Sequence, residues 1–375
     1  MMSPPGPHAV VDGIEYDYFG GTNYLGLHGH PEILTAASRA LESFGIHTAT
    51  SRSRFCSQAI LDAEDAASLY FGTEDAYYFV SGYMGGSIIA HALQGSIDAV
   101  FLDAASHYCL AEAATLVGVP VHRFATRDPE SLSRALREHL VADQTPLVVT
   151  DGVFPSSGLI APVREYTELL MHYPDGALLI DDAHGFGVLG DNGRGTYEHF
   201  GFWTEVNCSL GGPKPRLFAV GTASKALGGF GGLIPGSTEF INALRSASHH
   251  FDGASAPPIP VAAATAEALN LARTLPELRT HLRANTLKLR TRLQEIGVDV
   301  ADQPTPIVGF TYRDAATMQQ IHESLAASRI LVPYAPAYSD LGPAGALRIA
   351  VFANHTKSAI DRLLVELQRL TDTTN

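Results

Sequence analysis

Cysteine, lysine and long apolar runs are scarce in this chain of 375 residues. The cysteines and the apolar runs indicate the cellular compartment in which the protein resides. The three cysteines, Cys56, Cys109 and Cys208, lack the spacing of metal ligands and cannot all pair, which favours a reducing compartment. No apolar run reaches membrane-spanning length, and residues 1–7 lack the charged and apolar regions of a signal peptide. We therefore expect a cytoplasmic protein with no membrane partner and no metal site.

Basic residues are outnumbered as well, with 25 Lys and Arg against 39 Asp and Glu and a net charge of −14. This balance argues against general binding of nucleic acid or anionic membranes, although a local phosphate site remains compatible with it. Charged residues are only 17% and hydrophobic ones 46%, which fits a compact globular enzyme. A chain of this length can bury a large core and form two or three domains.

Short apolar runs alternate with helical patterns through most of the chain. The expected strands are residues 76–80, 99–102, 147–150, 177–180, 217–220 and 233–234, with helices such as 87–93, 110–117, 129–140 and 163–172 between them. This alternation predicts an α/β fold, in which helices cover both faces of a mainly parallel central sheet. Ligands of such sheets bind at the carboxyl ends of the strands.

The pattern changes after residue 249, where residues 255–260 (SAPPIP) interrupt the chain. We expect one long helical stretch over 261–293, strands at 306–312 and 346–351, and helices at 315–328 and 358–370, which together make a small α+β domain. The first residues resemble an arm, with Asn23-Tyr24-Leu25-Gly26-Leu27 as its one sharp motif. The predicted domains are therefore an arm over 1–44, a large domain over 45–248 and a small C-terminal domain over 249–375.

Lys225 is one of only four lysines and lies in a glycine-rich segment, residues 221–232 (GTASKALGGFGG). Upstream of it, the apolar run 177–180 ends in Asp181. A lysine that forms a Schiff base and a carboxylate that keeps a pyridine nitrogen protonated are the groups that hold pyridoxal 5'-phosphate, PLP. A surface lysine in a flexible loop and an N-cap aspartate are the alternatives. The glycines allow close approach of a ligand, and an unpaired carboxylate on a buried strand is costly, so we predict a PLP enzyme acting on an amino acid.

Other polar residues lie close to these two motifs in the sequence. His184 follows Asp181 by three positions and could bond the phenolic oxygen of PLP, although such a histidine is often structural. Residues 81–87 (SGYMGGS) join a strand to a helix, so the backbone amides of this turn, around Gly82 and Tyr83, could hold a phosphate. Many strand-to-helix turns carry glycine without binding anything. Thr222 and Ser224 place hydroxyls on either side of the lysine motif.

Two further residues suit an amino-acid substrate. His107 follows the strand 99–102, where an imidazole could stack on the pyridine ring and move protons at the substrate α-carbon. A strand-end histidine bonded to backbone is the alternative. Arg348 lies inside the apolar strand 346–351, where its guanidinium could bind a substrate carboxylate in a bidentate manner or form a structural salt bridge.

Taken in order, these motifs resemble the α-oxoamine synthases of the fold-type I PLP-dependent enzymes. The resemblance runs from about Asn23 to Leu370, and its best-matched segments are residues 23–27, 81–83, 181–195, 222–232 and 347–356. It implies a homodimer with active sites at the subunit interface. It also implies a transferase that forms a carbon–carbon bond by condensing an amino acid with an acyl thioester, usually acyl-CoA.

The resemblance also implies a role for each candidate residue. Lys225 would form the Schiff base and act as acid and base, and His107 would stack over the ring. Asp181 would pair with the pyridine nitrogen and His184 with the phenolic oxygen. The phosphate would be held by Gly82, Tyr83, Thr222 and Ser224, and the amino-acid substrate by Arg348 and Asn23.

The sequence departs from the family pattern mainly around the second substrate. Pro155 stands where the family has a serine, Gly86 replaces an asparagine, Gly253 and Ala254 replace a Ser-Thr pair, and residues 335–340 replace a Pro-rich loop. These changes motivate an alternative, a PLP-dependent β- or γ-elimination or replacement, with S-adenosylmethionine as one candidate substrate and a non-CoA electrophile as the acceptor. An aminotransferase and a non-catalytic partner subunit are further hypotheses, although retention of Lys225 argues against the second.

Overall fold

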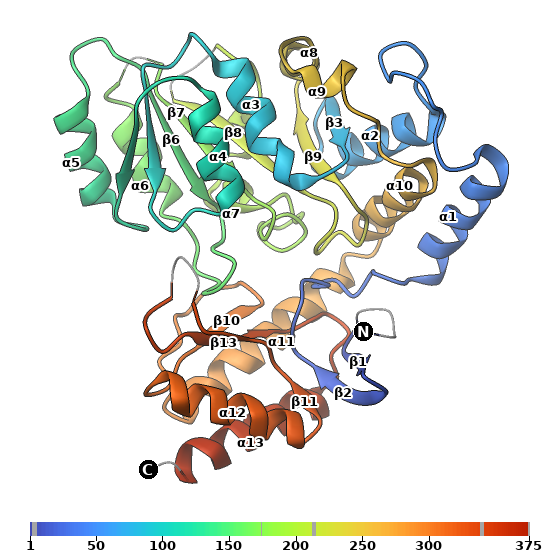
Figure 1. Ribbon diagram of the computed structural model, residues 1–375, viewed down its shortest axis with the longest axis vertical. Coiled ribbons are helices and arrows are strands. Elements are labelled where there is room, and N and C mark those ends of the chain that lie inside the picture. Colours follow the sequence, from blue (N-terminus) through green and yellow to red (C-terminus); the bar gives the residue numbers. More distant parts are fainter. Residues whose placement is uncertain (2–5, 174, 212–214, 338–340, 374–375) are drawn as a thin grey trace. The chain divides into compact units, whose positions relative to one another are not determined.

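The computed structural model describes residues 1, 6–173, 175–211, 215–337 and 341–373 (Figure 1). The chain forms two compact units. The large unit holds residues 31–153 and 161–274, and the small unit holds residues 1–30, 154–160 and 275–375. These limits differ from the boundaries predicted at residues 44 and 248, because α1 (Pro31–Phe44) packs against α10 (Ile259–Thr274) and both helices belong to the large unit.

The large unit is built on one seven-stranded sheet in the order β3-β9-β8-β7-β6-β4-β5. Only β9 runs against its neighbours, so the predicted mainly parallel α/β sheet is confirmed. The strands are β3 (Asp75–Phe79), β4 (Ala99–Asp103), β5 (Val121–Phe124), β6 (Pro146–Asp151), β7 (Ala177–Asp181), β8 (Arg216–Thr222) and β9 (Gly232–Gly236).

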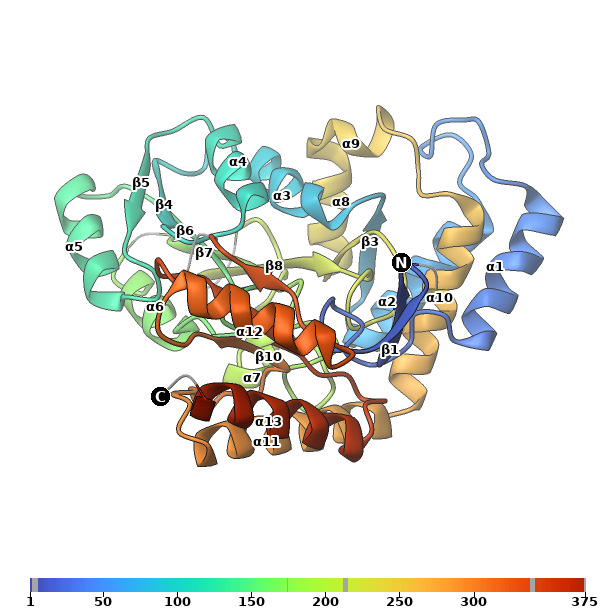
Figure 2. The same ribbon diagram turned by 60° about the horizontal axis from the view of Figure 1, so that its bottom comes forward.

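Helices lie over both faces of this sheet, as Figures 1 and 2 show. Besides α1 and α10 they are α2 (Gln58–Phe71), α3 (Gly85–Leu93), α4 (Tyr108–Leu116), α5 (Pro129–His139), α6 (Val163–Leu170), α7 (Thr196–Phe200), α8 (Thr238–Ala247), α9 (His249–Asp252) and the short 3-10 helices η1 (Gly82–Met84) and η2 (Trp203–Glu205). Ile88 of α3, Leu110 of α4 and Phe240 of α8 pack with Val100, Leu179 and Val220 of the strands in one buried core. Burial of this apolar surface is the main force that holds the sheet and these helices together.

Local sequence signals set the limits of several helices. Asp128 caps α5 by accepting a hydrogen bond from the Ser131 amide at 3.0 Å, and Pro129 occupies the first turn, where its missing N–H costs nothing. Gly72 ends α2 in a left-handed conformation with φ 63°, which favours glycine.

The small unit contains two three-stranded sheets, β1-β2-β11 and β10-β13-β12. Its strands are β1 (His8–Val11), β2 (Ile14–Tyr18), β10 (Ile307–Phe310), β11 (Ile330–Leu331), β12 (Tyr334–Ala335) and β13 (Ala346–Ala350). Its helices are α11 (Glu277–Glu295), α12 (Ala315–Ala327) and α13 (Lys357–Thr373). Phe19, Leu289, Met318, Leu347 and Leu363 belong to its buried core.

His355 joins the arm of the small unit to its core. Its ring stacks on Phe19 and Phe352, Nδ1 accepts from the Phe352 amide at 2.8 Å, and Nε2 lies 2.9 Å from the Tyr18 carbonyl oxygen. Because burial disfavours the charged imidazole, the pKa of His355 falls to about 4. This histidine, part of a motif that matched the family, therefore has a structural place in the small unit.

The helical stretch predicted over 261–293 is divided into two helices, because α10 ends at Thr274 and α11 begins at Glu277. Pro276 lies between them, and proline has no amide to donate and crowds the preceding turn. The strand β5 was not predicted. Its sequence, VHRF, lies at the edge of the sheet and is polar at two of its four positions. Within the described part of the chain, no helix has the length and hydropathy needed to cross a membrane.

Candidate active site

Asp181 is the last residue of β7 and is 8% exposed. Its Oδ1 accepts a hydrogen bond from the Ala183 amide at 2.9 Å, and its Oδ2 lies 3.4 Å from the Cys109 thiol. The carboxylate is thus held in place by the turn that follows β7 and by the first turn of α4. A charged group so buried is stable only with strong partners, and a protonated pyridine nitrogen would be one.

Lys225 lies just past the carboxyl end of β8, the strand paired with β7. Its Nζ is 2.9 Å from Nε2 of His184, which follows β7. The phenolic oxygen of PLP is carried by the ring carbon next to the one that bears the aldehyde. A histidine beside the lysine amine is therefore suitably placed for that oxygen.

The glycine turn after β3 lies against the end of β8. A Cβ atom on Gly82 would be 2.8 Å from Thr222 Cβ, so only glycine permits this approach without a shift. Thr222 Oγ1 lies 2.7 Å from Ser224 Oγ and donates to the Gly231 carbonyl oxygen at 2.7 Å. The structure thus brings Gly82, Tyr83, Thr222 and Ser224 together, with Ser81 capping η1 by accepting from the Tyr83 amide. Amides and hydroxyls gathered in this way form a cradle suited to a phosphate.

His107 precedes α4 and is fixed through both its backbone and its ring. Its amide donates to Asp151 Oδ2 at 2.8 Å, and its Nδ1 is 3.0 Å from Cys109 Sγ. The Tyr83 ring approaches it edge-on with centroids 6.0 Å apart. Burial lowers the pKa of His107, an effect that Asp181 opposes and Lys225 reinforces, so the imidazole is neutral at pH 7.

Asp151 is a neighbour of the site that the sequence did not single out. It pairs with Asp181 across β6 and β7 and is 4% exposed. Burial first, and then the negative charge of Asp181, raise the pKa of Asp151 well above its ordinary value. Asp151 therefore keeps its proton to a higher pH than an exposed carboxyl group does.

Cys109 is the second neighbour that sequence reasoning missed. It was counted only as evidence about the compartment, yet its thiol contacts both His107 and Asp181. Its position two residues after His107 at the start of a helix was the available signal for it. The signal for Asp151 was its place at the end of a predicted buried strand.

Asp182, the neighbour of Asp181, has a structural position. It is fully buried and accepts hydrogen bonds from the amide and hydroxyl of Thr196, the first residue of α7. A Cβ on Gly152, Gly185 or Gly195 would collide with its carboxylate, so these glycines make the space for it. Burial raises the pKa of Asp182 to about 7.

Arg348 and Asn23 belong to the small unit. The guanidinium donates to the carbonyl oxygens of Pro155 and Gly21 at 2.6 and 2.9 Å and to Tyr24 Oη at 3.0 Å. None of these three partners is a carboxylate, so these contacts do not support the ion-pair alternative for Arg348. Asn23 is buried, and its Oδ1 accepts from the His28 amide at 3.1 Å.

The departures from the family pattern have local explanations in part. A Cβ on Gly86 would lie 3.0 Å from Ala113 Cβ, so the packing of α3 on α4 leaves little room for an asparagine. Pro155 supplies its carbonyl oxygen to Arg348, a contact that any residue could make. Of the replaced loop at 335–340, residues Tyr338, Ser339 and Asp340 lie outside the described residues.

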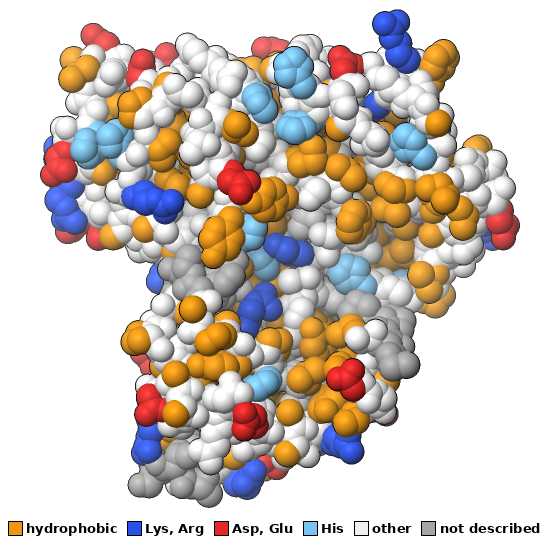
Figure 3. All heavy atoms as spheres, in the orientation of Figure 1, with side chains coloured by type: hydrophobic (Ala, Val, Ile, Leu, Met, Phe, Trp, Pro, Cys, Tyr) orange, Lys and Arg blue, Asp and Glu red, His pale blue; other side chains and the backbone are white. Residues whose placement is uncertain are grey.

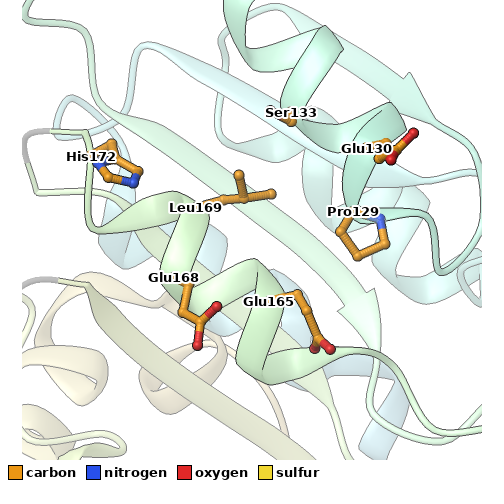
Figure 4. Close-up of a pocket in the computed structure, with 7 residues that line it drawn as sticks. All are labelled: Pro129, Glu130, Ser133, Glu165, Glu168, Leu169 and His172. Carbon is orange, nitrogen blue, oxygen red and sulfur yellow. The ribbon is translucent and has the colours of Figure 1, made fainter.

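A separate pocket of about 380 Å³ lies between α5 and α6 (Figure 4). Its lining includes Glu130, Glu165, Glu168 and His172 and none of the predicted site residues. Across the described residues, no group of three or more His, Cys, Asp or Glu side chains is arranged to hold a metal ion.

Comparison with known proteins identifies relatives of this chain. The 8-amino-7-oxononanoate synthase of Methylococcus capsulatus is 34% identical over 370 residues, covering 98% of this chain and 92% of the relative. The solved serine palmitoyltransferase of Sphingomonas wittichii superposes with a TM-score of 0.89 at 27% identity, covering 100% of this chain and 92% of the other. A structure of SPT with a PLP internal aldimine has a TM-score of 0.88 at 28% identity, with the same coverage.

The mainly parallel sheet and the relatives of this chain define a PLP-dependent transferase of fold-type I, with PLP as its cofactor. The family model for aminotransferase class I and II matches residues 19–367, so the chain belongs to that family. Its relatives within the family are α-oxoamine synthases, as the sequence motifs predicted. The residues present fit the cofactor, because the Gly82 cradle, the Asp181 carboxylate and the Lys225 amine supply one partner for each of its polar ends.

Gly82→Ala tests the cradle. The added Cβ forces Ser81–Tyr83 away from Thr222, and overpacking of this kind costs about 1–3 kcal/mol, so affinity for PLP should fall about tenfold or more. The measurement is a titration of the PLP-free protein with PLP, followed by absorbance. Gly211→Ala is the matched control, since a Cβ there meets nothing within 4 Å. Equal PLP affinities for the two variants would contradict the cradle.

Proposed function

We propose that this chain is an α-oxoamine synthase that condenses the α-carbon of an amino acid with an acyl thioester and releases carbon dioxide and the free thiol. The observation that carries the proposal is the placement of Lys225 Nζ, 2.9 Å from His184 Nε2, beside the strand that ends in Asp181. Support also comes from relatives named 8-amino-7-oxononanoate synthase and serine palmitoyltransferase, which span nearly the whole chain. The compounds in these names indicate two substrate pairs to test, which are alanine with a pimeloyl thioester and serine with a palmitoyl thioester.

Each residue then has a defined task in this reaction. When bound, PLP supplies an electron sink for negative charge at the substrate α-carbon. Lys225 Nζ takes the proton from that carbon and later returns one, which suits an amine held beside His184. Asp181 would keep the pyridine nitrogen protonated, and the neutral His107 would lie against the ring without adding positive charge.

The remaining roles concern binding. Gly82, Tyr83, Thr222 and Ser224 hold the phosphate and so fix the cofactor. Arg348, already oriented by Pro155, Gly21 and Tyr24, receives the substrate carboxylate, and Asn23 lies in the same unit to help shape that site. A planar guanidinium fixed in this way binds a carboxylate with little further loss of conformational freedom.

The alternative, elimination or replacement on an amino acid such as S-adenosylmethionine, gains no support from the relatives or from the solved structures. The substitution that motivated it, Pro155, offers Arg348 only a backbone carbonyl. Loss of the family's serine side chain is therefore compatible with an intact amino-acid site.

The assay mixes the PLP-loaded enzyme with each substrate pair and measures thiol release, carbon dioxide and the mass of the amino ketone. Lys225→Ala should abolish all three, whereas Lys288→Ala, which removes an amine bound to Asp361, should match wild type. Arg348→Lys loses the planar fork and should raise the KM for the amino acid about tenfold or more. Product formation by Lys225→Ala at the wild-type rate would overturn the mechanism. Turnover of S-adenosylmethionine without any thioester would favour the alternative.

We further propose a homodimer with shared active sites. Large apolar side chains are exposed on and just after α1, including Leu34, Leu41, Phe44 and Ile46. Figure 3 shows hydrophobic side chains gathered on this part of the large unit. Such exposed apolar surface is typical of a protein interface.

Light scattering on the PLP-loaded protein should therefore give twice the mass of the 40.0 kDa chain. Phe44→Asp with Ile46→Asp places charges on this surface and should shift the protein toward the single-chain mass. Leu287→Asp, an exposed leucine of α11, is the control that should leave the mass unchanged. A monomeric wild-type protein would contradict the proposal.

A further inference from the structure

Cys109 is buried at the start of α4, between two residues of the proposed cofactor site. Its Sγ lies 3.0 Å from His107 Nδ1 and 3.4 Å from Asp181 Oδ2. Both distances fall within the range of hydrogen bonds to sulfur. The thiol is thus the link between the ring-stacking histidine and the carboxylate assigned to the pyridine nitrogen.

We propose that Cys109 is a positioning residue whose thiol, shared between His107 Nδ1 and Asp181 Oδ2, acts with the Cys109 amide to fix the tautomer and orientation of the His107 ring. The inference rests on the proposed function of this site, and it adds a residue to which neither the motifs nor the names of the relatives assign a role. Cys109 itself touches neither substrate nor cofactor in this account; it acts through His107 and Asp181.

The Cys109 amide sets the tautomer of the His107 ring. It donates to Nδ1 at 3.3 Å, and a nitrogen that accepts carries no proton, so the neutral ring holds its proton at Nε2. The thiol has one proton and two acceptors within reach, His107 Nδ1 and Asp181 Oδ2. Donation of S–H to Nδ1, the shorter of the two contacts, favours the same tautomer, and the contact with Oδ2 keeps the sulfur between the ring and the carboxylate.

The residues around Cys109 and His107 keep the thiol and the imidazole neutral. Burial, the charge of Asp181 and the nearby Asp151 all raise the pKa of the Cys109 thiol, whereas Lys225 lowers it, so the proton stays on sulfur. Burial lowers the pKa of His107, Asp181 and Glu112 oppose that shift, and Lys225 adds to it. The groups that face this pair are therefore Asp151 and Asp181 from the ends of β6 and β7, Glu112 from α4, and Lys225 from beyond β8.

The competing explanation is that Cys109 only fills space in the core of the large unit, to which it belongs. Space-filling and hydrogen bonding predict different results for conservative replacements. Cys109→Ser keeps a group that donates and accepts, Cys109→Val keeps the volume without hydrogen bonds, and Cys109→Ala keeps neither. Cys208→Ala, at an exposed cysteine outside the site, is the control for losing a thiol.

The experiment records ¹⁵N NMR spectra of histidine-labelled protein, both PLP-free and PLP-loaded, with the His107 signal assigned from His107→Asn. Wild type, Cys109→Ser and Cys208→Ala should show His107 protonated at Nε2. Cys109→Val and Cys109→Ala should show a changed tautomer ratio and a shifted His107 titration. With the identified substrate pair, kcat of these two variants should fall about tenfold, the worth of roughly one hydrogen bond, while KM changes little.

An unchanged His107 tautomer in both Cys109→Val and Cys109→Ala would overturn the proposal. So would a wild type protonated at Nδ1. The NMR readout also separates this proposal from the proposed function. If no thioester condensation is found but the His107 signal responds to Cys109→Val and not to Cys109→Ser, the positioning role of Cys109 stands and the assigned reaction fails. If Cys109→Ala does not fold, the comparison of Cys109→Val with Cys109→Ser decides the question.

Discussion

Two buried carboxyl groups side by side constrain the large unit more than any other feature. Asp151 and Asp181 occupy paired positions at the ends of β6 and β7, and both are nearly inaccessible to solvent. Two such groups cannot both be charged without a large electrostatic cost. Burial and the negative charge of Asp181 raise the pKa of Asp151 well above its ordinary value, so Asp151 keeps its proton to a higher pH than an exposed carboxyl group does.

The other site residues of this unit are arranged around that charge. Lys225 comes from the next strand, His107 is held by the Asp151 carboxyl group through its amide, and the Cys109 thiol bridges His107 to Asp181. All of them lie shortly after the carboxyl ends of strands in a sheet with a packed core, so the ends of these strands determine where the residues are placed. Asp182 and its ring of glycines fix the segment that leads from β7 toward α7.

Sequence reasoning recovered the sheet and the candidate residues because buried strands appear as apolar runs and because Lys225 is so isolated in the sequence. It missed Cys109 and Asp151, since their importance comes from neighbours distant in sequence that only the strand register brings together. The break at Pro276 was not predicted, because the residues on both sides of it have a strongly helical composition. The role of Gly86 likewise became clear only from the packing of α3 against α4.

The central claim is that Asp181, and not Asp151, is the carboxyl group that keeps the cofactor nitrogen protonated. The most direct measurement is the PLP dissociation constant of Asp181→Asn compared with that of Asp151→Asn. Because an amide mimics a protonated carboxyl group, Asp151→Asn should stay within about threefold of wild type, and Asp181→Asn should weaken PLP binding about a hundredfold, as expected for loss of a charge-assisted hydrogen bond. Equal effects of the two substitutions, or a larger effect of Asp151→Asn, would contradict the account.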